Sequence, residues 1–194
     1  MPTPPADAAP AEQDGSSPAR ATALAAAVPV LLIALMYVPA ALQAGFIADD
    51  IKLLAHHAHP GDWLGEWTRS THQHATNVEG GYVWRPLTAT LHQLAGELFG
   101  RTPPVFRLLN TALHALNAVG VVLVARRLGA SALTAALLAT AWAMHPLLPD
   151  AVCWASATYD LQAATLLLPA LWVGLSERIS TGGRDVLSGL SAKC

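Results

Sequence analysis

Charged residues are scarce in this chain. Only 12% of its 194 residues are charged, which is about half the share found in a soluble domain. Hydrophobic residues make up 53%, the mean hydropathy is +0.39, and the apolar residues gather in long blocks. This composition argues against an ordinary soluble domain and predicts an all-α polytopic membrane protein surrounded by membrane lipid.

Cysteines and basic clusters are also few. The two cysteines, Cys153 and Cys194, lie far apart in the sequence, so a disulfide framework is unsupported. The formal net charge is -2 at pH 7 and no basic patch stands out. We therefore expect no nucleic-acid partner.

The first twenty residues are polar, small and rich in proline. Residues 1–20 also carry Asp7, Glu12 and Asp14, and they hold too little apolar surface to offset the entropy of ordering. We predict a disordered tail there. The apolar block that follows starts late and is longer than the ~7–15 residues of a signal-peptide core, so we interpret it as an uncleaved first span.

Four apolar segments are expected to be transmembrane helices, because backbone groups in lipid must bond within their own segment. The segments are 21–44, 105–125, 128–144 and 159–175.

The basic residues predict the orientation of these helices. Arg20 precedes the first span, Arg126 and Arg127 lie in the tight turn after the second, and further basic residues lie in the final segment 176–194. By the positive-inside rule these regions are cytoplasmic, in the plasma membrane of the cell, and the loop 45–104 faces outward. We read 176–194 as a short cytoplasmic tail.

The outer loop is expected to contain amphipathic helices that lie on the membrane surface. Asp49 or Asp50 would cap the first, and the second would start at Pro86. An apolar side of this second helix suits the headgroup plane. Its residues are Leu87, Leu91, Leu94, Leu98 and Phe99.

Asp49 and Asp50 are the first candidates for chemistry. Adjacent carboxylates near a low dielectric suit a general base or a ligand pair for a divalent cation, the candidate cofactor. The alternative is helix capping and solvation at the interface. Arg85, before the second outer helix, has the forked guanidinium that binds phosphate well. Its alternative is an interfacial arginine that meets lipid headgroups.

A polar stripe runs along the segment 105–125. Arg107, Asn110, His114 and Asn117 fall within an arc of roughly 80° on a helix. Polar groups at membrane depth face the bundle interior, where they either line a binding site or hydrogen-bond neighbouring helices. The sequence leaves these two interpretations open.

Two further candidates lie at the outer ends of the last two spans. His145 and Pro146 end the third span, and Asp160 enters the fourth. An acid at membrane depth needs a partner, for which Arg107 and His114 are the candidates. The alternative is that Asp160 lies shallow enough to be solvated.

The order of these features resembles the GT-C superfamily of membrane glycosyltransferases. The closest likeness is to relatives of protein O-mannosyltransferases that often carry tetratricopeptide repeats. The matching residues, within about 21–175, are Asp49-Asp50, Trp84-Arg85-Pro86-Leu87, Asn110 with His114, His145-Pro146, Asp150-Ala151-Val152 and Trp154. The chain departs from the family pattern at Trp84 for tyrosine, at Asp150 for glutamate and at Tyr159 for a basic residue.

The resemblance implies transfer of a sugar from a polyprenyl-phosphate donor to a protein or glycan acceptor on the outer face. It implies that Asp49 or Asp50 acts as base or metal ligand, that Arg85 meets the carrier phosphate, and that His145 borders the cavity; Arg107, His114 and Asp160 are further substrate-binding candidates. Because GT-C domains have many more spans, this chain is expected to be an N-terminal part or a truncated product.

Two other classes of function remain open from the sequence. One is a non-catalytic membrane bundle or an inactive remnant. The other is a transporter or lipid carrier, which would place polar linings through several spans. In this chain the polar groups cluster at the outer ends, which disfavours transport.

Overall fold

The computed structural model describes residues 17–43, 45–47, 50–51, 65–68 and 85–191, and for residues 65, 66 and 176–191 the backbone only. Within these ranges every regular element is helical, as predicted. Asp49 and most of the outer loop lie outside the described residues, so the helix predicted after Asp50 is seen only at its first residues.

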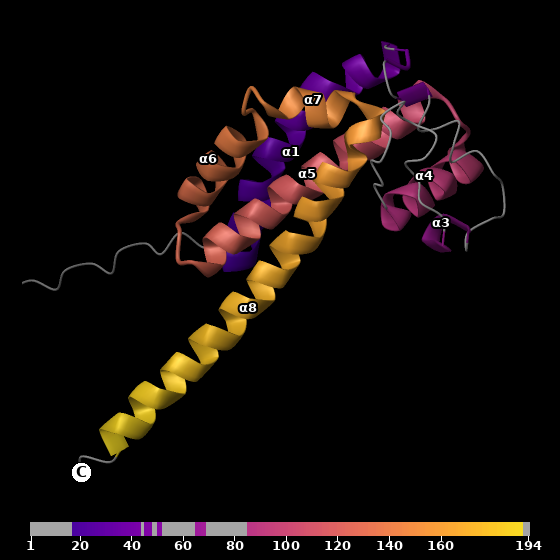
Figure 1. Cartoon of the computed structure of the whole chain (residues 1–194). Coiled ribbons are helices and arrows are strands. Elements are labelled where there is room, and N and C mark those ends of the chain that lie inside the picture. The colour runs from indigo at the N-terminus through magenta and orange to yellow at the C-terminus, as the bar shows by residue number, and fades with distance from the viewer. Residues whose placement is uncertain (1–16, 44, 48–49, 52–64, 69–84, 192–194) are drawn as a thin grey trace, which may run out of the picture.

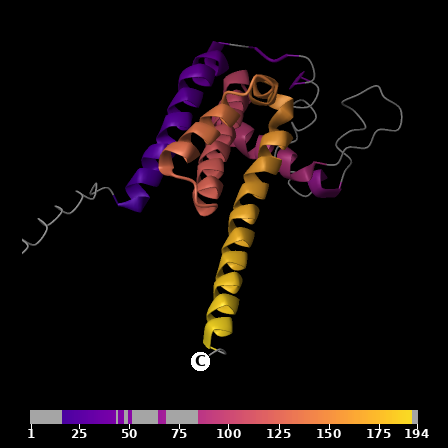
Figure 2. The ribbon, with the colours of Figure 1, turned by 90° about the vertical axis from the view of Figure 1, so that its left-hand side faces the viewer.

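Four helices lie side by side as a bundle (Figure 1). The first part of α8 packs on α5, and α8 then continues past the far end of the bundle, as Figure 2 also shows. The elements are α1 (Pro18–Gln43), α3 (Gly65–Thr68), α4 (Pro86–Phe99), α5 (Pro103–Arg127), α6 (Ala132–Ala143), α7 (Leu148–Cys153), the 3₁₀ helix η1 (Ala155–Ala157) and α8 (Thr158–Ser191).

Two helices, α1 and α5, are long and apolar enough to cross a membrane. At 1.5 Å per residue they measure about 39 and 38 Å, against about 30 Å of hydrocarbon. By contrast α6 has 12 residues, about 18 Å, and is shorter than the span predicted at 128–144. Helix α8 starts where predicted but continues to Ser191 instead of ending near 175.

The short α6 has a local cause at each end. Ser131 caps its start, because the hydroxyl accepts a bond from the Thr134 amide at 3.1 Å. Pro146 follows its other end and disfavours helical geometry at His145. The turn before α6 needs a left-handed residue, and Gly129 supplies it with φ of +89°. The Ala130 amide then donates to the Ala125 carbonyl at 3.0 Å, which closes the end of α5.

Small residues bring the helices together. The buried face of α6 consists of Ala135, Ala139 and Ala143. Helix α1 buries one residue in every four and mixes small with large side chains, namely Ala25, Pro29, Ile33, Tyr37 and Ala41. Small side chains at such spacing let helix backbones approach closely, as in membrane bundles. Between α5 and α8, Gly120 leaves room for the side chain of Leu168.

The large apolar side chains point outward. Leu31, Leu35 and Leu133 are 67%, 73% and 70% exposed, on α1 and α6. Helix α4 is inverted relative to a helix in water, since it buries His92 and Gln93 and exposes most of its leucine face. Such an arrangement is stable where the surrounding solvent is itself apolar, and in water it would be an aggregation liability.

We predict that Gly120→Ala destabilises the bundle by about 1–3 kcal/mol, the usual cost of overpacking. An added Cβ would lie 2.9 Å from Leu168 Cδ1 and 3.0 Å from Leu168 Cβ, and the Cβ moves only if α8 moves. Gly174→Ala on α8 is the matched control, because nothing lies within 4 Å of its added Cβ. Thermal unfolding in detergent measures both variants. Equal melting temperatures for the two variants would refute the close contact.

Candidate functional site

Several predicted site residues meet where α1 ends and where α5 and α8 begin. Asp50 contacts Ser156, Arg85 contacts Tyr159 and Arg107 contacts Gly45. The Arg126–Arg127 turn lies at the opposite end of α5. The fold therefore gathers residues from distant parts of the sequence at one end of the bundle.

Asp50 is a structural anchor for this end. Its side chain is fully buried; Oδ1 accepts a bond from the Ser156 amide at 2.9 Å and Oδ2 one from the Ile47 amide at 3.3 Å. Amides at the start of a helix have no partner within the helix, and a carboxylate there is favoured by the helix dipole. Asp50 therefore stabilises the segment that leads into α8, which is a capping role on a different helix from the one predicted.

The metal hypothesis for the aspartate pair stays a prediction. Asp49 lies outside the described residues. Among the residues that are described, no group of three or more His, Cys, Asp or Glu side chains could hold a metal ion. Both oxygens of Asp50 already accept a backbone amide.

Arg85 stacks on an aromatic ring. It precedes α4, whose first residue is Pro86 as predicted, and its guanidinium carbon lies 3.4 Å from the centre of the Tyr159 ring. A cation over a ring face is attracted by the ring quadrupole, and the contact holds the guanidinium plane in place. Arg85 is half-buried.

The polar stripe of α5 is buried and bonds to other segments. The Asn110 amide donates to the Trp154 carbonyl at 2.7 Å, and Asn110 Oδ1 accepts from the Thr158 hydroxyl at 2.6 Å. Asn117 repeats this pattern with the Leu161 carbonyl at 2.9 Å and the Thr165 hydroxyl at 2.8 Å. These two residues tie α5 to the start of α8.

His114 ties α5 to α6. Its Nε2 lies 3.0 Å from the carbonyl oxygen of Ala143, the last residue of α6. A carbonyl only accepts, so Nε2 carries the hydrogen and donates it. The ring packs against Tyr37 and Trp142, with centroid distances of 5.7 and 5.0 Å. Of the two interpretations of the stripe, these bonds favour interhelical attachment for Asn110, His114 and Asn117.

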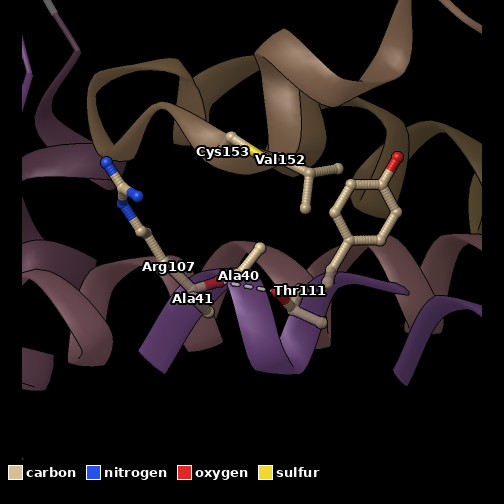
Figure 3. Close-up of a pocket in the computed structure, with 7 residues that line it drawn as sticks. Ala40, Ala41, Arg107, Thr111, Val152 and Cys153 are labelled. Atoms are coloured by element: carbon tan, nitrogen blue, oxygen red, sulfur yellow. Dashed lines mark hydrogen bonds between the residues drawn. The ribbon is translucent and has the colours of Figure 1, made fainter. Parts of the chain in front are cut away.

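Arg107 differs from the other stripe residues. It is 4% exposed and donates through Nη2 to the Gly45 carbonyl, while its Nε has no hydrogen-bond partner. It borders a small pocket between α1, α5 and α7, shown in Figure 3. Burial raises the pKa of the Cys153 thiol in the same wall, and the Arg107 charge opposes that rise in part. The thiol is therefore neutral at pH 7.

His145 and Asp160 lie at the surface. His145 is exposed in the turn between α6 and α7, and its Nδ1 accepts from the Leu147 amide at 3.4 Å. Asp160 is exposed in the first turn of α8, where the helix dipole favours an acid. The expectation that Arg107 or His114 pairs with Asp160 was wrong, because both bond elsewhere; the solvated alternative fits the observed exposure.

The sequence did not predict which residues contact Asp50, Arg85 and the polar side chains of α5. The hydroxyl of Thr158, in α8, hydrogen-bonds to His92 Nε2 of α4 at 2.8 Å, to Asn110 Oδ1 of α5 at 2.6 Å and to the Ala155 carbonyl at 2.8 Å. Thr158 therefore links α4, α5 and α8. The one available signal was the position of His92 and Gln93 opposite the leucines of α4. Tyr159 offered only a departure from a family pattern, and nothing in the sequence pointed to Ser156.

No protein-family model, no curated protein and no solved structure matches this chain.

We predict a favourable coupling energy between Asn117 and Thr165 of about 0.6 kcal/mol, the average for such bonds in membrane proteins. Asn117→Leu, Thr165→Val and the double variant form the cycle, with unfolding in detergent as the measurement. The hydroxyl of Thr165 donates to Asn117 Oδ1, so each single variant leaves a buried group without its partner. Strictly additive single effects would show that the bond does not join the two helices.

Proposed function

We propose that this chain is the membrane part of a glycosyltransferase that moves a sugar from a polyprenyl-phosphate donor to an acceptor hydroxyl at the outer face. One observation carries the proposal. Asp50 and Arg85, from separate motifs, contact Ser156 and Tyr159, which are three residues apart in the chain. The Asp50 carboxylate and the Arg85 guanidinium thereby approach one short segment at one end of the bundle.

The proposal includes four membrane crossings. We infer that α1, α5, the segment 128–144 around α6 and the first part of α8 cross the bilayer, because their outward residues are large and apolar. The leucine face of α4 would rest in the headgroup region of the same leaflet as Asp50. By the charge rule, the Arg126–Arg127 turn is cytoplasmic and the Asp50 end is outside.

The chemistry asks for a base and for a stabilised leaving group. The acceptor oxygen attacks the anomeric carbon, the bond from that carbon to the phosphate oxygen breaks, and the polyprenyl phosphate leaves. Asp49 would take the hydroxyl proton, since the oxygens of Asp50 already accept amide bonds. Arg85, held by Tyr159, would stabilise the charge on the phosphate. A divalent cation held by Asp49 is the alternative source of that stabilisation.

A non-catalytic bundle is the second candidate. The observation that favours it is the bonding of Asn110, His114 and Asn117 to other segments, which leaves these side chains little capacity for substrate. A transfer assay separates the two candidates.

We predict that Asp49→Ala lowers sugar transfer by about 10²–10⁴-fold, the usual contribution of a general base. Membranes containing the full chain are assayed with a panel of polyprenyl-phosphate-linked sugars and hydroxyl acceptors. Arg85→Gln should weaken binding of a short prenyl phosphate, whereas Arg20→Gln, at the other end of α1, is the charge-matched control. Transfer at the wild-type rate by Asp49→Ala would remove its catalytic role. Absence of transfer by a folded wild-type chain would favour the non-catalytic bundle.

We predict that a thiol-reactive probe that cannot cross the membrane labels Ile51→Cys in whole cells and labels Leu128→Cys only after permeabilisation. Both positions are well exposed, at 60% and 66%, so access depends on the side of the membrane. The background carries Cys153→Ser and Cys194→Ser. The reverse labelling pattern would place the Asp50 end inside the cell and overturn the proposed enzyme.

A further inference from the structure

The two arginines at the end of α5 differ in their contacts. Arg126 donates through Nε to the Thr22 hydroxyl at 3.2 Å and through Nη1 to the Ala130 carbonyl at 2.7 Å, so it ties the turn to α1. Arg127 is half-buried, and within the described part of the chain it has no hydrogen-bond or ion-pair partner. Its charge is therefore available to an anion that is not part of the described protein.

An aromatic ring of α8 holds the guanidinium of Arg127. The guanidinium carbon lies 5.5 Å from the centre of the Trp172 ring, within the range of about 6 Å over which a ring face attracts a cation. The contact lies where α8 continues past the end of α5 (Figures 1 and 2). Trp172 is 40% exposed, so the ring and the charge lie together at the surface of the bundle.

Exposed apolar side chains surround this charged position. Leu123 lies one turn before Arg127 on the same side of α5, and Leu171 and Val173 flank Trp172; all three are exposed. A tryptophan ring combines an apolar body with a polar N–H and is favoured where hydrocarbon meets water. A cation, an indole and aliphatic side chains in this order match a molecule with an anionic head and apolar chains.

We propose that Arg127 and Trp172 bind the phosphate headgroup of one anionic phospholipid of the cytoplasmic leaflet, which is rich in such lipids. The Nη groups of Arg127 would donate to the phosphate, because its Nε is covered by protein atoms. Arg126, in the last turn of α5, offsets the partial negative charge of the helix end. The inference requires the membrane crossings proposed above and does not depend on glycosyl transfer.

The test measures lipid binding to the purified full chain in a neutral detergent. Phosphatidylglycerol, phosphatidylcholine and inorganic phosphate are titrated separately, with native mass spectrometry to count bound lipid and thermal unfolding as a second readout. We expect saturable binding of one phosphatidylglycerol, weaker binding of phosphatidylcholine and no stabilisation by inorganic phosphate. Arg127→Gln should weaken phosphatidylglycerol binding about fivefold, the effect of one basic residue near an anionic surface. Arg20→Gln, which removes an equal charge from the exposed start of α1 at the same end of the bundle, should bind like the wild type.

A second variant keeps the proposal testable if Arg127→Gln disturbs the fold. Trp172→Leu keeps every charge and should also weaken binding, whereas Trp172→Phe should retain most of it. Equal losses in Arg127→Gln and Arg20→Gln would show a diffuse attraction and overturn the proposal, as would equal affinity for the two lipids. Stabilisation by inorganic phosphate alone would assign the position to free phosphate. Glu177 is the first acid after Trp172 in the sequence. A wild type that binds no phosphatidylglycerol, with binding gained in Glu177→Gln, would make Glu177 the counter-charge of Arg127 instead.

Discussion

The fold depends on hydrogen bonds made by one helix. Asn110, His114 and Asn117 of α5 are buried and bond across to Trp154 before η1, to α6 and to α8. In a bundle whose outer surface is apolar, water does not reach these buried side chains, so each must hydrogen-bond to a partner inside the protein. The helices can therefore pack together in few registers. Packing of alanines alone would allow the helices to slide, whereas directional bonds do not.

The same constraint explains why the molecule has its leucines outside. Its interior combines alanines and a few large apolar side chains, such as Ile33 and Phe106, with buried amide, imidazole and hydroxyl groups, and most of its leucine side chains lie on the surface. Helix α4 follows this rule although it lies at the end of the bundle, since His92 and Gln93 point inward. An apolar surrounding medium accounts for both observations without a separate cause for each.

At the end of the bundle where α5 begins, some residues hold the structure together and others are proposed to react. Asp50 holds Ser156, and Tyr159 holds Arg85, so residues beside the proposed reacting groups position the start of α8. The buried Arg107 is the exception, since its charge lacks a partner among the described residues.

The sequence by itself determined that the chain is helical, that α1 and α5 are apolar helices of spanning length, and that α4 begins at Pro86. These features follow from composition, periodicity and proline, which act within one segment. The sequence also placed Arg107, Asn110, His114 and Asn117 on one face of α5. It left open whether they line a site or attach helices, because that depends on the groups opposite them.

Only the tertiary structure decided the partners. Asp50 bonds Ser156, which lies 106 residues away, and Asp160 stays exposed although a paired acid was expected. The length of α6 was also misjudged, because hydropathy does not register the cap at Ser131 or the stop near Pro146. Contacts between distant segments depend on how helices pack, and packing depends on positions such as Gly120, where the side chain of Leu168 lies against a glycine. The residue pattern of one segment does not determine which other segment packs against it.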